Sequence, residues 1–295
     1  MSCPGPGGVL SHWSLSPLGV VAVAVLLAHE AGAARLAARS AARRPRRALR
    51  AWCFRAGVLC VLAVTVTPAA YEGTRLLWVH MVDHVVLMFF APAALVAGGP
   101  VVPLAWALPV GARRRALRWL RFSGPGAALR ALWGLLTRPA VAFVLVNAAM
   151  VVWHLPRVLD VALSTPAVRE LAMEPSFLLA GLCFWRSLVP SHPYAPRARL
   201  RTAAVLVVGT NLVMLALAIS MAIFTAHAWY SVPGHAHQGA HAAFAAQQLA
   251  AGVLWICGDF WAGPALVLIA VQLVRRDGSL LDALDRELTA RATTA

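Results

Sequence analysis

Long apolar stretches separated by short arginine-rich segments dominate this chain. A transmembrane α-helix needs about 20 predominantly apolar residues, and seven stretches reach or approach that length. They lie at residues 16–35, 52–70, 75–97, 139–156, 168–189, 202–229 and 242–274. The pattern predicts an all-α, polytopic membrane protein with seven transmembrane helices over residues 1–276 and a tail over residues 277–295.

Three other segments are not predicted to span. Residues 101–110 are too few and include Pro103 and Pro109, which favours a re-entrant or interfacial piece. Residues 113–136 alternate basic and apolar positions, which is typical of an amphipathic helix at a membrane surface. The tail after residue 276 is expected to be a short amphipathic helix or disordered.

Charge supports this interpretation. The chain is 60% hydrophobic and only 13% charged, whereas soluble domains carry about 25% charged residues. Its formal net charge of +15 comes entirely from arginine. All arginines except Arg75, Arg157 and Arg169 lie in residues 35–55, 98–138, 186–201 and 275–291. The positive-inside rule therefore predicts an outer N-terminus and a cytoplasmic C-terminus. Contact with membrane lipid explains the basic excess better than nucleic acid does.

Two histidines lie inside the third apolar stretch. An ionisable side chain within a membrane is costly, so its presence indicates a functional site. His80 and His84 are four residues apart and share one face of a helix. Two imidazoles at this spacing can bind one transition-metal ion, and imidazole suits copper, zinc, iron and nickel. Asp83 lies between them and is placed to orient a ring or accept a proton.

The predicted topology gathers further polar side chains near the outer ends of the spans. His154 ends the fourth stretch and is the third candidate metal ligand. Supporting candidates at the same end are Met81, Glu174, His227, His235, His237, His241, Gln247 and Gln248. A thioether beside imidazole suits Cu(I) in particular.

Each of these residues also has a structural alternative. A single histidine at a helix end often anchors the helix at the interface, and methionines often fill gaps in a core. The two glutamines can hydrogen-bond across helices, and the histidine-containing loop can simply be solvated. Asp259, deeper in the seventh stretch, either pairs with His29 or lines a polar cavity.

Catalysis is not indicated. The chain contains no nucleophile–base constellation, phosphate-binding glycine loop or paired catalytic carboxylates. Its five cysteines are scattered without a Cys-x-x-Cys pair, so the sequence predicts neither a disulfide framework nor a thiolate zinc site. We therefore expect a protein that is not an enzyme.

Several motifs resemble those of a known family. The first runs from His80-Met-Val-Asp-His84-Val-Val-Leu through Ala91-Pro92 to Gly98-Gly99-Pro100. The others are Asn147 with Trp153-His154-Leu-Pro156, the segment 176–185, and Gln247-Gln248-Leu-Ala-Ala-Gly-Val-Leu-Trp255. Over residues 70–275 the chain is similar to the CtaG-type polytopic cytochrome c oxidase assembly factors.

This resemblance implies a multi-pass protein of the bacterial plasma (inner) membrane that helps to mature a haem–copper oxidase of the respiratory chain. The resemblance also implies that the protein binds copper, as transient Cu(I), through His80, His84 and His154. In a chaperone role it would then deliver this copper to the Cu-B centre of the oxidase. The implied partners are cytochrome c oxidase subunits, with a periplasmic or extracellular copper chaperone as a further candidate. Two positions depart from the family pattern: Glu174 stands where a histidine is expected, and Ala246 where an acidic residue is expected.

Two alternative functions stay open at this point. Histidines on the third and fourth spans can be axial ligands of a b-type haem. Polar groups within spans can also line the path of a copper or proton transporter, in which case they should continue to the inner face.

Overall fold

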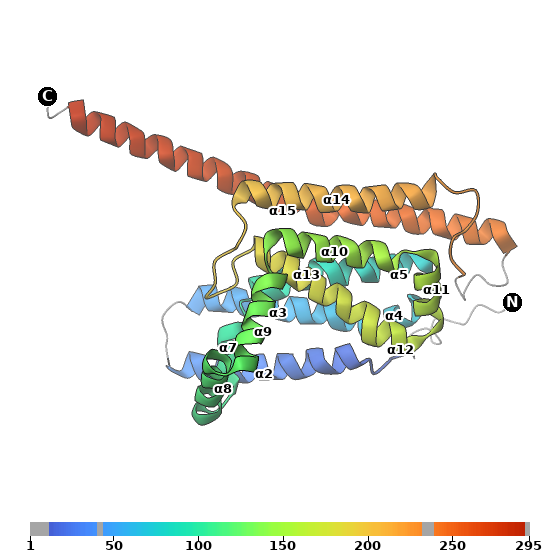
Figure 1. The fold of residues 1–295 in the computed structure, drawn as a ribbon, viewed down its shortest axis with the longest axis horizontal. Helices are drawn as coiled ribbons and strands as arrows, with labels where there is room; N and C mark the ends of the chain where they lie inside the picture. Colours follow the sequence, from blue (N-terminus) through green and yellow to red (C-terminus); the bar gives the residue numbers. More distant parts are fainter. Residues whose placement is uncertain (1–11, 40–43, 232–238, 293–295) are drawn as a thin grey trace.

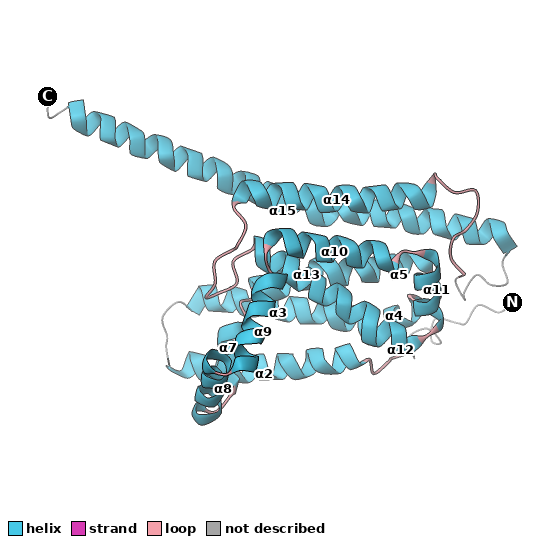
Figure 2. Ribbon diagram, viewed as in Figure 1, coloured by secondary structure: helices cyan, strands magenta, loops and turns pink. Residues whose placement is uncertain are grey.

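The computed structural model describes residues 12–39, 44–231 and 239–292, and for Arg44 and residues 275–292 it describes the backbone alone. Within these ranges the chain is helical and forms no β-strand, as predicted (Figure 2). The helices, with η for π-helical segments, are α2 (Pro17–Arg39), α3 (Arg44–Thr65), α4 (Pro68–Glu72), α5 (Leu77–Val85), η1 (Val86–Phe90), α6 (Ala91–Ala97), α7 (Val101–Ala107), α8 (Val110–Phe122), α9 (Gly124–Leu136), α10 (Pro139–Trp153), α11 (Pro156–Ser164), α12 (Pro166–Val168), η2 (Arg169–Met173), α13 (Glu174–Leu188), α14 (Leu200–Ala222) and α15 (Gly239–Ala292).

Five helices among the described residues are long and apolar enough to cross a membrane: Pro17–Arg39, Pro45–Thr65, Leu77–Ala97, Leu200–Ala222 and Gly239–Val274. The pair α9 and α10, bent by 76°, makes a sixth if both halves form one span. Helices suit this role because lipid offers no partners for backbone N–H and C=O groups. The chain is therefore a multi-pass membrane protein by length and composition, while seven spans and the orientation of the termini stay predictions.

The helix that carries the histidine pair lies at the centre of the bundle. In the span Leu77–Ala97, 67% of the residues in its 18-residue apolar stretch are buried inside the protein. The corresponding share is 22–33% in the four other single-helix spans. Its segments α5, η1 and α6 contact α3 on one side and α13 and α15 on others, while α14 lies along α15 and α10 lies along α13 (Figure 1). Most side chains on α5, including His80 and His84, are therefore buried against protein.

Two π-helical turns interrupt the helices nearest this centre, and each precedes a proline. Proline has no N–H to donate and clashes with the carbonyl of the preceding turn. Pro92 follows η1 and Pro175 follows η2 by two residues. The helix accommodates each proline with a wider turn, in which Ala91 N–H bonds to the Val86 carbonyl and Glu174 N–H bonds to the Arg169 carbonyl. Such turns are frequent at functional sites.

The arginine-rich connection between the third and fourth stretches forms one end of the bundle. The helices α7, α8 and α9 cluster there, whereas α4, α11 and α12 lie at the opposite end (Figure 1). As predicted, residues 101–110 do not span; α7 lies against α2, where Gly32 approaches the Pro103 carbonyl so closely that any larger side chain would collide. The prediction of a single amphipathic helix over residues 113–136 is wrong, because two helices, α8 and α9, cover this segment. They meet at Ser123, whose Oγ caps α9 by accepting a hydrogen bond from Gly126 N–H at 3.0 Å.

The C-terminal helix α15 also differs from expectation. A separate short helix or disorder was predicted after residue 276, yet the α15 backbone continues through that position to Ala292. It projects well beyond the other helices in Figure 1. The predicted domain boundary at residue 276 is therefore not marked by a break in secondary structure.

Candidate functional site

Three histidines from two separate helices meet in the core. The rings of His80 and His84 on α5 lie with their centroids 4.2 Å apart. The ring of His154, the residue that follows α10, lies 5.1 Å from that of His84. Each of the three residues is only 2% exposed. Helix periodicity explains the first contact. The third ring comes from α10, which packs on α13 as do η1 and α6, the continuation of α5.

Three of the six ring nitrogens in this cluster are buried without a hydrogen-bond partner among the described residues. His80 Nε2 and both ring nitrogens of His84 are buried with no partner among the described residues. His154 Nδ1 lies 2.6 Å from the Met150 carbonyl, to which it donates, and Nε2 then faces Met81 Sδ at 3.2 Å with its lone pair. Burying an unpaired polar group costs about 1–3 kcal/mol, so the cluster is expensive unless something binds those nitrogens.

A small cavity adjoins the histidine pair. Its volume is about 10 Å³, about the minimum for one water molecule. His80, Asp83, His84, Met173 and Glu174 are among the residues that line it. The structure thus brings two of the supporting candidates, Asp83 and Glu174, to the same space as the imidazoles.

An arginine that sequence reasoning did not assign to the site lies in this cavity as well. Arg169, in η2, contacts Glu174 Oε1 at 3.5 Å and Glu170 Oε1 at 3.1 Å. The second oxygen of Glu174, Oε2, is buried without a hydrogen bond among the described residues. Arg169 is one of only three arginines outside the arginine-rich connections, and that isolation was the available signal. The Arg169 guanidinium forms an ion pair with the Glu174 carboxylate, so Glu174 is not free to act as a metal ligand.

Aromatic side chains close the cluster on other sides. Phe177 on α13 lies against the His84 ring, with centroids 4.4 Å apart. Tyr230 donates its hydroxyl proton to the His154 carbonyl at 2.8 Å. Burial, with a smaller contribution from Asp160, raises the pKa of Tyr230, so the hydroxyl stays protonated and available to donate. Nothing in the sequence pattern identified either residue, because both sit among ordinary aromatic positions.

Gln247 has a structural role. It is 1% exposed, and its Oε1 accepts from Trp229 N–H at 2.6 Å while Nε2 donates to the Met221 carbonyl at 2.9 Å. These bonds join α15 to the last turn of α14 and to the segment that follows it, and the bond to Met221 is the cross-helix alternative named for this residue. Gln248 is exposed and donates to the Ala222 carbonyl at 3.4 Å.

The structure describes two of the remaining supporting histidines, and neither is buried in the cluster. His227 and His241 are exposed, and His235 and His237 lie outside the described residues. The suggested pairing of Asp259 with His29 is wrong. His29 contacts Glu30 at 3.2 Å and stacks on Phe54, whereas exposed Asp259 accepts from Asn211 at 3.4 Å.

The described residues contain no group of three or more His, Cys, Asp or Glu side chains arranged to hold a metal ion together. The three imidazoles are close, and their rings meet edge to face. Metal binding by His80, His84 and His154 therefore stays a prediction.

In a comparison with protein-family models, residues 27–276 match the model of the cytochrome c oxidase caa3 assembly factors. The chain belongs to this family. Searches of curated proteins and of solved structures found no match. The predicted resemblance is confirmed, and it extends further toward the N-terminus than the motifs that indicated it.

Membership of this family indicates the general role of the protein. It takes part in assembly of cytochrome c oxidase and so interacts with components of that enzyme. An assembly role also suggests a function other than catalysis. The family match covers the entire histidine cluster and the helices that build it.

Proposed function

We propose that this assembly factor binds Cu(I) transiently at the histidine cluster and passes it to an oxidase subunit for the Cu-B centre. His80 and His84 supply imidazole nitrogens, and His154 with the Met81 thioether completes a soft ligand set. Copper is the cargo in this scheme. Two or three such ligands give an ion that can leave again, which suits transfer better than storage.

The single observation that carries the proposal is the set of three buried ring nitrogens without partners in His80 and His84. Metal–imidazole bonds are about 2 Å long, so rings with centroids 4.2 and 5.1 Å apart can share one ion after modest side-chain rotation. Imidazole and thioether together favour Cu(I) over harder ions. Family membership supplies the recipient, because cytochrome c oxidase contains copper.

The two alternative functions receive less support. A haem held by His84 and His154 would need its macrocycle between the rings, yet these rings touch edge to face beside a cavity of about 10 Å³. A transport path would need polar groups that continue to the other end. Within the described residues, His29 pairs with Glu30 and Asp259 faces outward, so neither extends such a path.

The proposal is tested first on the purified protein. Wild type and the His80→Ala/His84→Ala variant are loaded with Cu(I) under reducing conditions, and bound copper is measured after gel filtration. The matched control is His227→Ala/His241→Ala, which removes two exposed histidines. We expect stoichiometric copper in wild type and in the control, and loss of copper in the cluster variant.

The second test is made in cells. A deletion strain should produce oxidase with reduced copper content and low activity, restored by wild type and by the control but not by the cluster variant. If the oxidase isolated from the deletion strain has normal copper and activity, delivery to Cu-B is wrong. If the cluster variant binds copper like wild type, the assigned ligands are wrong.

A further inference from the structure

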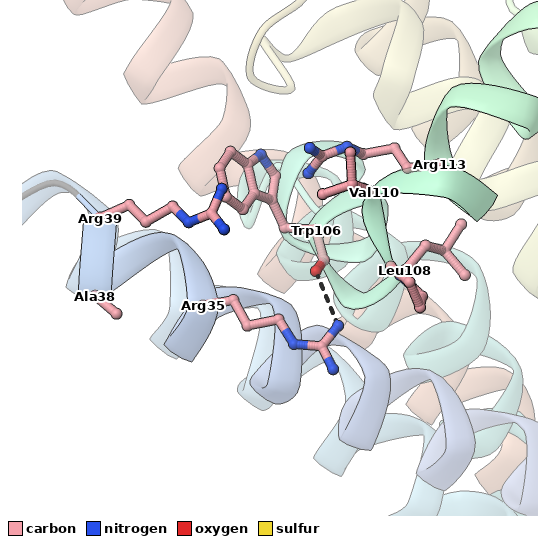
Figure 3. Close-up of a pocket in the computed structure, with 8 residues that line it drawn as sticks. Arg35, Ala38, Arg39, Trp106, Leu108, Val110 and Arg113 are labelled. Atoms are coloured by element: carbon pink, nitrogen blue, oxygen red, sulfur yellow. Dashed lines mark hydrogen bonds between the residues drawn. The ribbon is translucent and has the colours of Figure 1, made fainter.

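A second cavity lies far from the histidine cluster, at the end of the bundle formed by α7, α8 and α9. Its volume is about 410 Å³, within the range of small-molecule sites. The last two turns of α2 form one wall, and the link from α7 to α8 forms the other (Figure 3). The side chains that matter here are Arg35, Arg39, Trp106 and Arg113.

Three guanidinium groups line this cavity around one indole ring. Arg39 from α2 and Arg113 from α8 flank Trp106, with their Cζ atoms 5.3 and 4.5 Å from the ring centroid (Figure 3). Arg35 donates to the backbone carbonyls of Trp106 and Ala107, the last residues of α7. Arg35 therefore fixes α7, and the other two arginines are held in place by the indole.

The positive charge of this cavity has no internal counter-charge in the described part of the chain. None of the cavity-lining residues is acidic, and the ion pairs found among described residues do not include Arg35, Arg39 or Arg113. The nearest acidic side chain on α2, Glu30, is already bound to Arg55 at 2.6 Å. Cations held this close repel one another unless an anion lies between them.

The start of α8 adds to the attraction for an anion. Val110 lines the cavity and is the first residue of this 13-residue helix. No side chain caps that end, so its first N–H groups are free to bind a ligand and carry the positive end of the helix dipole. Phosphate groups commonly bind at such ends.

We propose that this cavity binds a phosphate group, and that its source is the headgroup of an anionic phospholipid. Arg39 and Arg113 contact the phosphate oxygens, and Trp106 lies at the level of the headgroups. The helix α8 has a strongly basic sequence and no buried residue, as expected for a helix on a membrane surface. Basic pockets between transmembrane helices are known to bind anionic headgroups.

The test uses the full-length protein purified in detergent and measures ligand binding by native mass spectrometry and by competition. The probes are phosphatidylglycerol, zwitterionic phosphatidylcholine and inorganic phosphate. Arg39→Gln/Arg113→Gln removes the two cavity charges. Arg118→Gln/Arg121→Gln removes two charges from α8 without touching the cavity lining and is the matched control.

We expect phosphatidylglycerol to bind wild type and the control variant at least about 10-fold more tightly than phosphatidylcholine. The cavity variant should lose about 10-fold in affinity, as is reasonable for two charge-assisted bonds. If millimolar inorganic phosphate displaces phosphatidylglycerol, and this displacement requires Arg39 and Arg113, the cavity is a phosphate site whose ligand is the free anion. The lipid part of the proposal is then wrong. Equal losses in both double variants, or equal binding of the two lipids, would overturn the proposal. If the double variant does not purify, Arg113→Gln alone is compared with Arg118→Gln on the same criteria.

Discussion

The unpartnered nitrogens of His84 lead to a prediction about stability. A neutral imidazole has one N–H donor and one acceptor nitrogen, and in His84 both are buried without a partner among the described residues. Each such group costs about 1–3 kcal/mol. The substitution His84→Leu removes both groups and fills a similar volume. It loses the ring contact with Phe177 at 4.4 Å, worth about 0.5–1.5 kcal/mol. We therefore expect copper-free His84→Leu protein to be about 1–3 kcal/mol more stable than wild type.

Gln247 provides the matched comparison. It is as buried as His84, at 1% against 2% exposure, but both ends of its amide are hydrogen-bonded. Gln247→Leu makes the same kind of change, from polar to aliphatic, at a satisfied position. It leaves the Trp229 N–H and the Met221 carbonyl without these partners, which should destabilise the protein by about 1–3 kcal/mol. The two substitutions are thus expected to have opposite signs.

The measurement is unfolding of purified protein in detergent with a Cu(I) chelator, followed by the same experiment with copper. Free copper at 100 times its Kd should stabilise wild type by about 2.7 kcal/mol and leave His84→Leu unchanged. The reasoning fails if His84→Leu is destabilised in chelator to the same degree as Gln247→Leu. That result would mean that the ring nitrogens of His84 have partners in the folded protein and are not held open for a ligand.

Three further predictions concern residues around the cluster. Met81→Leu should lower Cu(I) affinity about 10-fold through loss of a soft ligand, whereas Met214→Leu, equally buried elsewhere, should not; competition with a Cu(I) chelator measures both. Glu174→His should raise Cu(I) affinity in the same titration, and no change would show that this position lies outside the ligand set. Gly181→Val should destabilise the protein by about 1–3 kcal/mol, because a Cβ there collides with the Met88 carbonyl and approaches Pro92 Cγ at 2.6 Å. Gly134→Val, which meets no described atom within 4 Å, should leave unfolding unchanged.

The helical architecture and the histidine cluster were accessible from sequence for simple reasons. Membrane helices must be long and apolar, so their positions follow from composition alone. His80 and His84 are one turn apart, so their contact follows from helix geometry. His154 was placed near them because the predicted topology gave both spans the same outer depth. The spacing of residues along a helix and the depth of a residue within a membrane span can both be read from the order of residues in one sequence.

What could not be predicted depends on register and on side-chain partners. Arg169 begins the π-helical turn η2 and contacts Glu174, five residues later, across that turn. Regular α-helical spacing does not reveal this contact. The break at Ser123 depends on a cap formed with Gly126. The pairing of Asp259 depends on which helix lies beside α15, and α14 supplies Asn211 instead of the His29 that was considered.

The π-helical turn η1 connects two parts of one span that both pack on α13. An α-helix turns about 100° per residue, so one extra residue in a turn rotates everything before it by that angle relative to everything after it. In η1 the turn separates His84, which contacts Phe177 on α13, from Pro92, which lies against Gly181 one turn further along α13. Pro92 enforces the turn because it cannot donate the regular bond to the Met88 carbonyl. The Ala91-Pro92 pair that follows the histidine motif therefore belongs to the turn between the helix that carries the imidazoles and the helix packed on Gly181, although neither residue can bind a metal through its side chain.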